Sequence, residues 1–564
     1  MSHWPSWLST GILAIVFACS RICTAQTLTT TVNGAQLYEN FGTAVAFVGD
    51  VNLDGVVDLA VSAPNHQTCS LFTCSNPGQV RVLSGADQQV LLAMTGVVSN
   101  SFGPSSDLFG ASLAGGLDVN LDGYPDIVVG EPLDRTNCTS VFGARGSVHV
   151  YSGFDGSLLH SILGSQCGGF FSPSATMGSA VGMVHDVNGD GRAEFLVSSP
   201  GTWVVEVRSG LDGSVLSAPA APSTAVRFGD ALAVLGDING DGIDEYLVGA
   251  PHFYPPSWLN SDHGAIFACS ASTGAVVYSF SGSNAGDQLG AALARIDDVN
   301  GDGVADFAAG APGWDVPGAI DAGGVFIYSG ATGAWIRSVL GSVAGQGFGS
   351  KLSGGGDIDG DGAGDLLVGI PQTGEIVAVS GGTGNILYTL PAPTSSSGFG
   401  SALAGPFDMN QDGNPELVAG APSGTPGQVF IYASRTLASI QVPGPGCLNG
   451  SPPQLSSTPP ILGGTVTLSV TQAPPALAGA LFVSNVPLQP YVIAPGCSIW
   501  VDPLAFDTLA SFTTDPAGQW ALALSLPNLP ALAGVRFALQ AAVAPTGSPL
   551  GLDLTNGLYL TLGY

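Results

Sequence analysis

The sequence has very few basic residues. Twelve lysines and arginines stand against 42 aspartates and glutamates, the single lysine is Lys351, and the formal net charge is -30. Because phosphate neutralisation needs clustered lysine and arginine, this composition excludes nucleic-acid binding and a polybasic membrane-binding surface. Only 10% of the residues are charged but 45% are hydrophobic, so the chain can bury a large core and is not a disordered protein.

Long hydrophobic runs are missing beyond the amino terminus. The apolar segment Gly11–Cys19 is too short to span a bilayer, and the small residues Cys23–Ala25 precede Gln26 as a signal peptidase requires. We therefore expect residues 1–25 to be a signal peptide, although its usual basic start is missing, and a degenerate lipoprotein site at Cys19 is the alternative. The sequence predicts a mature protein that is secreted or at the cell surface, without a transmembrane helix.

Motifs of common enzyme classes are missing as well. We find no Gly-x-Ser-x-Gly, no His-Glu-x-x-His and no phosphate-binding loop. His149, His160 and His185 fall in or beside expected strands, where a packing role is favoured over catalysis. We predict no enzymatic activity. A polysaccharide lyase is the enzymatic alternative, by analogy alone, but it would need a base and several cations in one cleft.

Turn-forming residues are abundant. The chain has 82 glycines and 39 prolines, far more than a helical protein tolerates. This composition favours many short strands joined by tight turns, so the predicted fold class is all-β.

An acidic pattern recurs seven times. It reads Asp-x-Asn/Asp-x-Asp-Gly-x-x-Asp/Glu, and the copies are 51 to 68 residues apart. Nine residues before each first Asp stands a large apolar residue followed by Gly, and six residues after each last carboxylate stands a proline, as with Phe41 and Pro64. Because all length variation lies outside this spacing, one structural module is repeated seven times.

Each module is predicted to contain four strands. An apolar strand such as Phe228–Gly236 precedes the acidic loop, and a run such as Ile127–Val129 follows it, apolar at consecutive positions and therefore buried on both faces. Gly324–Tyr328 and Trp335–Leu340 illustrate the third and fourth strands. The sequence thus predicts a seven-bladed β-propeller over residues 26–443. Either 27–32 or 437–442 could supply the strand that closes the ring.

The repeats resemble a known family. The Phe-Gly that opens each copy, the acidic loop, and the Gly-Ala-Pro that ends at Pro251, Pro312 and Pro422 are similar to the FG-GAP repeats of integrin α subunits. The resemblance implies a seven-bladed propeller, calcium in the loops between first and second strands, and ligand recognition at the opposite face. Departures are Met177 and Leu289 for Phe, and Glu131, Ser199 and Ile370 for Ala, which we interpret as changes at packing positions.

The acidic loops have the oxygen donors that calcium prefers. Loop positions 1, 3, 5 and 9 supply carboxylates or amides, Gly at position 6 permits a sharp turn, and position 7 is unrestricted, as expected if it contributes only a carbonyl. The predicted ligands are Asp50, Asn52, Asp54, Asp58, Asp118, Asn120, Asp122, Asp126, Asp186, Asn188, Asp190, Glu194, Asp237, Asn239, Asp241, Glu245, Asp298, Asn300, Asp302, Asp306, Asp357, Asp359, Asp361, Asp365, Asp408, Asn410, Asp412 and Glu416.

The alternative is that these acids only form Asx turns between strands. Seven loops with one ligand spacing favour structural calcium, up to seven Ca2+ ions, with an affinity of roughly 0.1–1 mM as in extracellular modules. A catalytic calcium is disfavoured because the protein fills every oxygen position.

Cysteines fit an oxidising compartment. Loop positions make the pairs Cys69–Cys74 and Cys138–Cys167 plausible, Cys447 and Cys497 would pair within the C-terminal part, and Cys269 remains as a buried free thiol.

Residues 444–564 are predicted to form a second, small β-sandwich-like domain. A Pro/Gly-rich segment separates it from the repeats, and expected strands alternate with Pro/Gly turns. These strands are 465–471, 480–484, 498–502, 520–526 and 535–543.

The long loops opposite the acidic loops are the candidate ligand face. Aromatic residues on the loops of blades 4 and 5 could bind a sugar ring or a protein loop, or could instead pack against each other. The candidate residues are His252, Phe253, Tyr254, Trp258, Trp314 and Asp315. We therefore predict an extracellular adhesion or recognition module for an unidentified protein or glycan ligand. The alternative is a calcium-dependent polysaccharide-binding lectin or a polysaccharide lyase.

Overall fold

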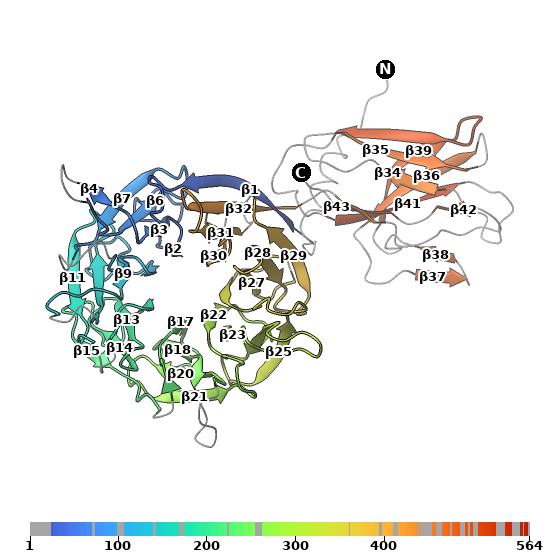
Figure 1. Ribbon diagram of the computed structural model, residues 1–564. Coiled ribbons are helices and arrows are strands. Elements are labelled where there is room, and N and C mark those ends of the chain that lie inside the picture. Colours follow the sequence, from blue (N-terminus) through green and yellow to red (C-terminus); the bar gives the residue numbers. More distant parts are fainter. Residues whose placement is uncertain are drawn as a thin grey trace. The chain divides into compact units, whose positions relative to one another are not determined.

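Every regular element in the described part of the chain is a β-strand (Figure 1). The computed structural model describes residues 24–564 except 70–73, 99–105, 139–142, 169–173, 223–224, 254–261, 360, 394–397, 410–414, 437–438, 442–453, 458–464, 474–476, 485–490, 495–496, 500–505, 526–535, 544–552, 556–557 and 562–564. It contains two compact units: one is Gln26–Ile358 with Gly362–Ala433, and the other is Ser434–Tyr564 with Asp359–Asp361 and residues 24–25. The all-β prediction is confirmed.

The first unit is a ring of four-stranded antiparallel sheets, seven of them among the described residues (Figure 1). We call these sheets blades 1 to 7. Blade 1 has β2 (Val45–Phe47), β3 (Leu59–Ala63), β6 (Gln79–Leu83) and β7 (Val90–Thr95), and blade 2 has β8 (Ser112–Gly115), β9 (Ile127–Glu131), β10 (Ser147–Tyr151) and β11 (Leu158–Leu163). Blade 3 has β12 (Val181–Val184), β13 (Glu194–Ser199), β14 (Val204–Arg208) and β15 (Val215–Ser217), and blade 4 has β17 (Ala231–Gly236), β18 (Glu245–Ala250), β20 (Ala265–Ser270) and β21 (Val276–Ser281).

The remaining blades repeat this order. Blade 5 has β22 (Ala292–Ile296), β23 (Asp306–Ala311), β24 (Gly324–Tyr328) and β25 (Trp335–Leu340), and blade 6 has β26 (Lys351–Gly355), β27 (Asp365–Ile370), β28 (Glu375–Val379) and β29 (Ile386–Pro391). Blade 7 has β30 (Ala402–Phe407), β31 (Glu416–Ala421) and β32 (Gln428–Thr436), and its fourth strand is β1 (Thr24–Asn33). Two small sheets of two strands lie outside the blades: the hairpin of β4 (Thr68–Cys69) and β5 (Cys74–Ser75), and the pair of β16 (Ala225–Val226) and β19 (His252–Phe253).

The hydrophobic pattern explains the packing of the blades. Second strands such as β3 and β9 are buried along their whole length because each blade is covered on both faces by its neighbours. The Phe-Gly pair that opens a repeat fixes the contact to the previous blade: Phe41 is 0% exposed. At Gly42, φ is 89° and a Cβ would lie 2.6 Å from the carbonyl oxygen of Gln428, so only glycine fits there.

The amino-terminal segment closes the ring. Strand β1 pairs with β32, the Thr29 hydroxyl donates to the carbonyl oxygen of Ile431 at 2.9 Å, and the Gly34 amide donates to that of Gly427 at 2.9 Å. The other candidate segment contains β33 (Ser439–Gln441), which pairs with β43 (Leu558–Thr561) in the second unit. Strand β1 begins two residues before Gln26, inside the predicted leader.

The second unit contains two larger sheets. One has β33, β43, β41 (Arg536–Val543), β36 (Ala478–Ser484) and β39 (Phe506–Thr513), with β42 (Asp553–Leu554) beside β41. The other has β34 (Gln454–Ser457), β35 (Thr465–Thr471) and β40 (Trp520–Ser525), and β37 (Tyr491–Ala494) pairs with β38 (Cys497–Ile499) separately. Val466 and Val470 of one sheet pack with Leu481 and Leu539 of the other, so the two sheets share one hydrophobic core.

Candidate metal-binding loops

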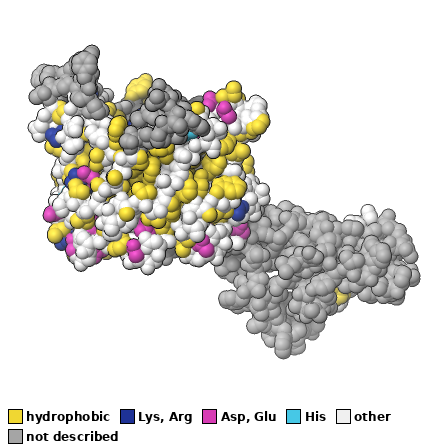
Figure 2. Space-filling view, turned by 90° about the horizontal axis from the view of Figure 1, so that it is seen from below, with side chains coloured by type: hydrophobic (Ala, Val, Ile, Leu, Met, Phe, Trp, Pro, Cys, Tyr) yellow, Lys and Arg dark blue, Asp and Glu magenta, His cyan; other side chains and the backbone are white. Residues whose placement is uncertain are grey.

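The acidic loops all join the first strand of a blade to its second. Since every blade runs in the same direction around the ring, the described parts of these loops emerge at one edge, which we call the acidic edge. Figure 2 shows a row of acidic side chains along the lower edge of the ring and hydrophobic side chains over its wall. Glycine at position 6 has positive φ where the structure describes it, for example 90° at Gly55.

The carboxylate at position 1 holds the turn together. In the first loop, Asp50 Oδ2 accepts the amide of Gly55 at 2.7 Å and Asp50 Oδ1 accepts the amide of Asp54 at 3.0 Å. The bond from position 6 to position 1 recurs at Asp118, Asp186, Asp237, Asp298 and Asp357. The amide of Gly242 accordingly holds the pKa of Asp237 below its usual value.

Positions 3 and 5 continue the same arrangement. Asn52 Oδ1 accepts the amide of Asp54, and Asp54 Oδ1 accepts the amide of Val56, both at 2.9 Å. These are Asx turns, which these side chains can form with or without a bound cation. Each of these hydrogen bonds uses one lone pair of an oxygen and leaves another for a cation.

The carboxylate at position 9 is different because it is buried and fixed by two parts of the backbone. Asp58 Oδ2 accepts the amide of Val51 at 2.9 Å, and Asp58 Oδ1 accepts the amide of Gly85, in the turn between third and fourth strands, at 2.9 Å. The first of these bonds recurs in every repeat, at Asp126, Glu194, Glu245, Asp306, Asp365 and Glu416. The second recurs at Asp126, Asp306 and Asp365.

The acids of a loop also act on one another electrostatically. Burial raises the pKa of Asp126 to about 6, and the charges of Asp122 and Asp118 contribute to this increase. Burial likewise raises the pKa of Glu194 to about 7, with contributions from Asp190 and Asp186. Ionised carboxylates at this spacing repel each other, and a divalent cation among them would remove that penalty.

The donor geometry fits a cation best in two loops. One carboxylate oxygen each from Asp186, Asp190 and Glu194 lie within 4.8 Å of one another, and so do oxygens of Asp357, Asp359 and Asp361. These sets contain only oxygen donors, which suit Ca2+ or Mg2+ rather than zinc. Of the predicted ligands, Asn410 and Asp412 lie outside the described residues.

The candidate ligand-face residues fall into two separate places. His252 Nδ1 lies 3.0 Å from Asp262 Oδ2 and borders a cavity of about 360 Å³ with Arg227 and Gln288. Trp314 packs edge-on against Phe326, with ring centroids 4.8 Å apart, and Asp315 Oδ1 accepts the amide of Asp321 at 2.9 Å. The Phe253 ring packs against Phe267. Tyr254 and Trp258 lie outside the described residues.

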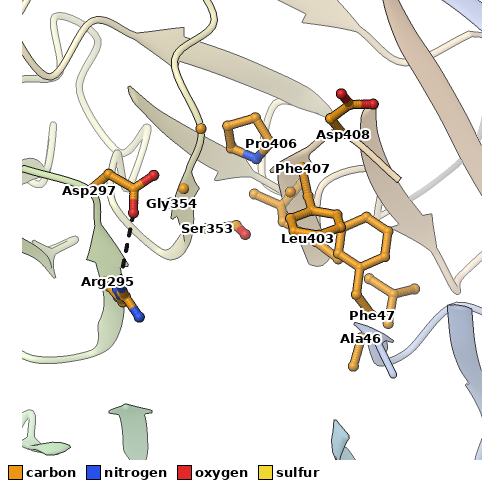
Figure 3. Close-up of a pocket in the computed structure, with 15 residues that line it drawn as sticks. Ala46, Phe47, Arg295, Asp297, Ser353, Gly354, Leu403, Pro406, Phe407 and Asp408 are labelled. Carbon is orange, nitrogen blue, oxygen red and sulfur yellow. Dashed lines mark ion pairs between the residues drawn. The ribbon is translucent and has the colours of Figure 1, made fainter. Parts of the chain in front are cut away.

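The innermost strands border a central cavity of about 540 Å³ that the sequence did not reveal (Figure 3). Phe47 and Phe407, with ring centroids 5.4 Å apart, form an apolar side with Leu403. Arg295 and Asp297 lie across from them with N and O atoms 3.9 Å apart, an exposed pair that contributes little stability. Strands β2, β22 and β30 bring these residues together from distant parts of the sequence.

The interpretation of Glu131 as a simple change at a packing position is wrong, because its side chain forms a buried polar contact. Its carboxylate is 2% exposed, and Oε2 lies 2.9 Å from His149 Nε2 and 3.2 Å from the Ser147 hydroxyl. Burial raises the pKa of Glu131 to about 7. His149, as expected, has a role within a strand, but that role is to pair with a buried acid.

The cysteines are partly as predicted. Cys138 and Cys167 form a disulfide, which confirms that pair, and Cys269 is a buried free thiol. Cys69 lies directly opposite Cys74 in the β4–β5 hairpin. Cys447 lies outside the described residues, and the side chain of Cys497 is likewise not described.

Comparison with known proteins agrees with the repeat pattern. A family model described as FG-GAP repeat matches residues 41–83, 109–151 and 399–432, and one described as FG-GAP-like repeat matches residues 186–248. Integrin alpha-IIb of Mus musculus is 38% identical over 104 residues, covering 18% of this chain and 9% of its own length. Integrin alpha-PS3 of Drosophila melanogaster is 33% identical over 190 residues, covering 30% and 15%.

The chain thus spans only a small part of the length of these curated relatives. Among solved structures, the Cps50 (Swd1) beta-propeller domain of Myceliophteria thermophila aligns with a TM-score of 0.43 and 13% identity, over 72% of this chain and 99% of its own. The part of the chain that the structure describes has no helix long and apolar enough to cross a membrane. By its sequence matches and its ring of four-stranded sheets, the chain carries FG-GAP repeats on an integrin-α-like β-propeller.

Proposed function

We propose that this chain is an exported, calcium-stabilised propeller that recognises an extracellular ligand and has no enzymatic activity. The observation that carries the proposal is the acidic edge, where the first six repeats fold one loop of oxygen donors each, with the same hydrogen bond from position 6 to position 1. Similarity of the repeats to those of integrin alpha subunits supports recognition as the role.

Calcium is the cation that the loops favour. In the third repeat, Asp186, Asn188, Asp190 and Glu194 with the carbonyl of Arg192 would supply the oxygen ligands. Calcium accepts six to eight oxygens in flexible geometry, whereas Mg2+ demands an octahedron and retains several waters. The bound ion would supply positive charge that offsets the repulsion among the carboxylates. Its role is structural, because it secures the turn that joins the first two strands of a blade.

Recognition is assigned to the edge opposite the acidic edge. Loop lengths there vary from repeat to repeat, whereas the acidic loops are constant, and variable loops on a rigid scaffold are the usual place for binding residues. The partner would be an extracellular protein or glycan, and the location would be secreted or at the cell surface.

Thermal unfolding of the full chain tests the proposal. The unfolding temperature is measured in three samples, one with about 5 equivalents of chelator per site, one with added calcium and one with added magnesium. We expect calcium to raise the unfolding temperature more than magnesium does at equal free concentration. An unfolding temperature that is insensitive to chelator would contradict structural calcium. Binding to immobilised extracellular-matrix proteins and glycans, measured with and without calcium, tests recognition separately.

A further inference from the structure

Blades 4 and 5 form an aromatic groove on the outer wall of the ring. The groove encloses about 250 Å³ and is bordered by Trp314, Phe326, Tyr328 and Trp335 of blade 5 and by Ser281 and Ser283 at the end of blade 4. Among the described residues, no side chain that lines the groove is charged, in a chain whose net charge is -30. From this geometry we infer that the groove binds a neutral hexopyranose residue of a glycan.

The floor of the groove is rigid before any ligand arrives. The Tyr328 ring is stacked between Phe280 and Phe307, with centroid distances of 5.0 Å and 5.3 Å, and is 8% exposed. Tyr278 completes the cluster, with its ring centroid 6.1 Å from that of Phe307 and 5.5 Å from that of Phe280. These rings belong to the hydrophobic cluster between the two blades, so the groove is part of the core packing and pays little ordering entropy on binding.

Trp335 presents the ligand surface. It is the first residue of the fourth strand in its blade and is 59% exposed. The same position in the other repeats is exposed and aliphatic, at Val90, Leu158, Val215, Val276 and Ile386. All six of these positions are therefore apolar. Among them, only the position in blade 5 carries an aromatic ring, and that ring borders the groove.

The chemistry of the lining selects a neutral sugar over other ligands. A pyranose ring has one face of C–H groups, which packs on indole rings, and a rim of hydroxyls, which the exposed Ser281 and Ser283 can reach by hydrogen bonding. An acidic sugar would meet no cation in the groove and would be repelled by the overall charge. A basic peptide would find no carboxylate there with which to pair.

This inference rests on the proposed recognition function, since it names the class of ligand. The test uses the full chain in saturating calcium. Saturation-transfer NMR detects binding of each probe, and titration with the hexaoses measures the affinity. The probes are methyl glycosides and hexaoses of glucose, galactose and mannose, with galacturonate as the acidic comparison. We expect a neutral probe to bind and Trp335→Ala to weaken its binding about tenfold, as loss of one stacking ring should.

Trp203→Ala is the matched control, because Trp203 is also an exposed tryptophan, 43% exposed, in blade 3 and outside the groove. It should bind like the unmodified chain. Because Trp335 is largely exposed, its variant should keep the calcium-dependent unfolding temperature, which shows that the propeller is intact. Ser283→Trp, which would fill the groove, provides a second variant that should lose binding.

The inference is wrong if no neutral probe binds, if only galacturonate binds, or if Trp335→Ala binds as tightly as Trp203→Ala. Each of these outcomes leaves the proposed function standing when the chain still unfolds in a calcium-dependent manner and still binds a protein ligand. Loss of both calcium dependence and all ligand binding would instead overturn the proposed function.

Discussion

Asp126 accepts the backbone amide of Val119 at 2.7 Å and so connects the last acid of its loop to the second residue of the same loop. Its other oxygen accepts the amide of Gly153, 27 residues further on, at 3.0 Å. This carboxylate therefore stabilises the blade whether or not a cation is bound. In this respect the acid at position 9 differs from the acid at position 5, which is exposed to solvent.

Asp126→Ala should destabilise the chain by about 2 kcal/mol in chelator, because two backbone N–H groups lose their acceptor. Asp122→Ala, at position 5 of the same loop, should cost less than about 1 kcal/mol under the same conditions, as exposed polar substitutions usually do. Urea unfolding in chelator measures both. Equal losses for the two variants would show that position 9 has no separate structural role.

Asp190→Asn should remove one cation from the protein. Asp190 is one of three acids whose oxygens converge in the third loop, and loss of its charge weakens the attraction for a divalent ion. We expect the number of bound calcium ions per chain to fall by one, measured by equilibrium dialysis. Asp212→Asn is the control, because Asp212 is an exposed acid of the same blade outside the acidic loop. An unchanged count for Asp190→Asn would argue against a cation in that loop.

Glu131 should make the protein less stable as the pH rises. Burial raises the pKa of Glu131 to about 7; the hydrogen bond to His149 limits this increase, and the charges of Asp134 and Asp107 contribute to it. The folded state therefore holds a proton that the unfolded state loses above its ordinary pKa of 4.5, so this group lowers stability between about pH 4.5 and pH 7.

Glu131→Gln should abolish that part of the pH dependence. At pH 5 the variant and the unmodified chain should be similarly stable, and at pH 8 the variant should be more stable by on the order of 2 kcal/mol. Urea unfolding in saturating calcium keeps the loop acids neutralised and isolates the effect. A stability difference that is the same at both pH values would contradict the buried-acid interpretation.

Val32→Asp should open the ring. Val32 of β1 packs against the cluster that contains Phe41 and Ile431, and an unpaired charge in that position should cost about 2–3 kcal/mol. Leu28→Asp is the control in the same strand, because Leu28 is 43% exposed. Hydrogen exchange should show loss of protection in β32 for the first variant alone. Equal protection in the two variants would mean that β1 does not hold the ring closed.

Much of the fold follows from local sequence. The spacing from Phe41 to Pro64, repeated seven times, predicts the sheets, and Gly324–Tyr328 and Trp335–Leu340 are strands in the structure with those bounds. In the second unit, the expected strand 465–471 coincides with β35. These predictions are correct because strands and turns depend on short-range patterns of apolar and turn-forming residues, which can be read from neighbouring positions in the sequence.

What the sequence could not predict depends on contacts between distant residues. Both terminal segments have the pattern of a fourth strand, and only the folded ring shows that β1 pairs with β32. Position 9 looks like a metal ligand in the sequence, but its bond to the turn between third and fourth strands exists only once the blade has formed. The cluster beneath the blade 5 groove similarly assembles Phe280, Phe307 and Tyr328 from three strands of two blades.

The closing strand also dictates when the molecule can finish folding. Thr29 and Ile431 are separated by 402 positions, so β1 is synthesised long before the strand β32 with which it pairs. A chain interrupted before Gln428 would expose two open sheet edges, one on each side of the gap, and such edges template aggregation. When the seventh blade is complete, the ring no longer has these two open edges, and pairing with the edges of other chains is prevented.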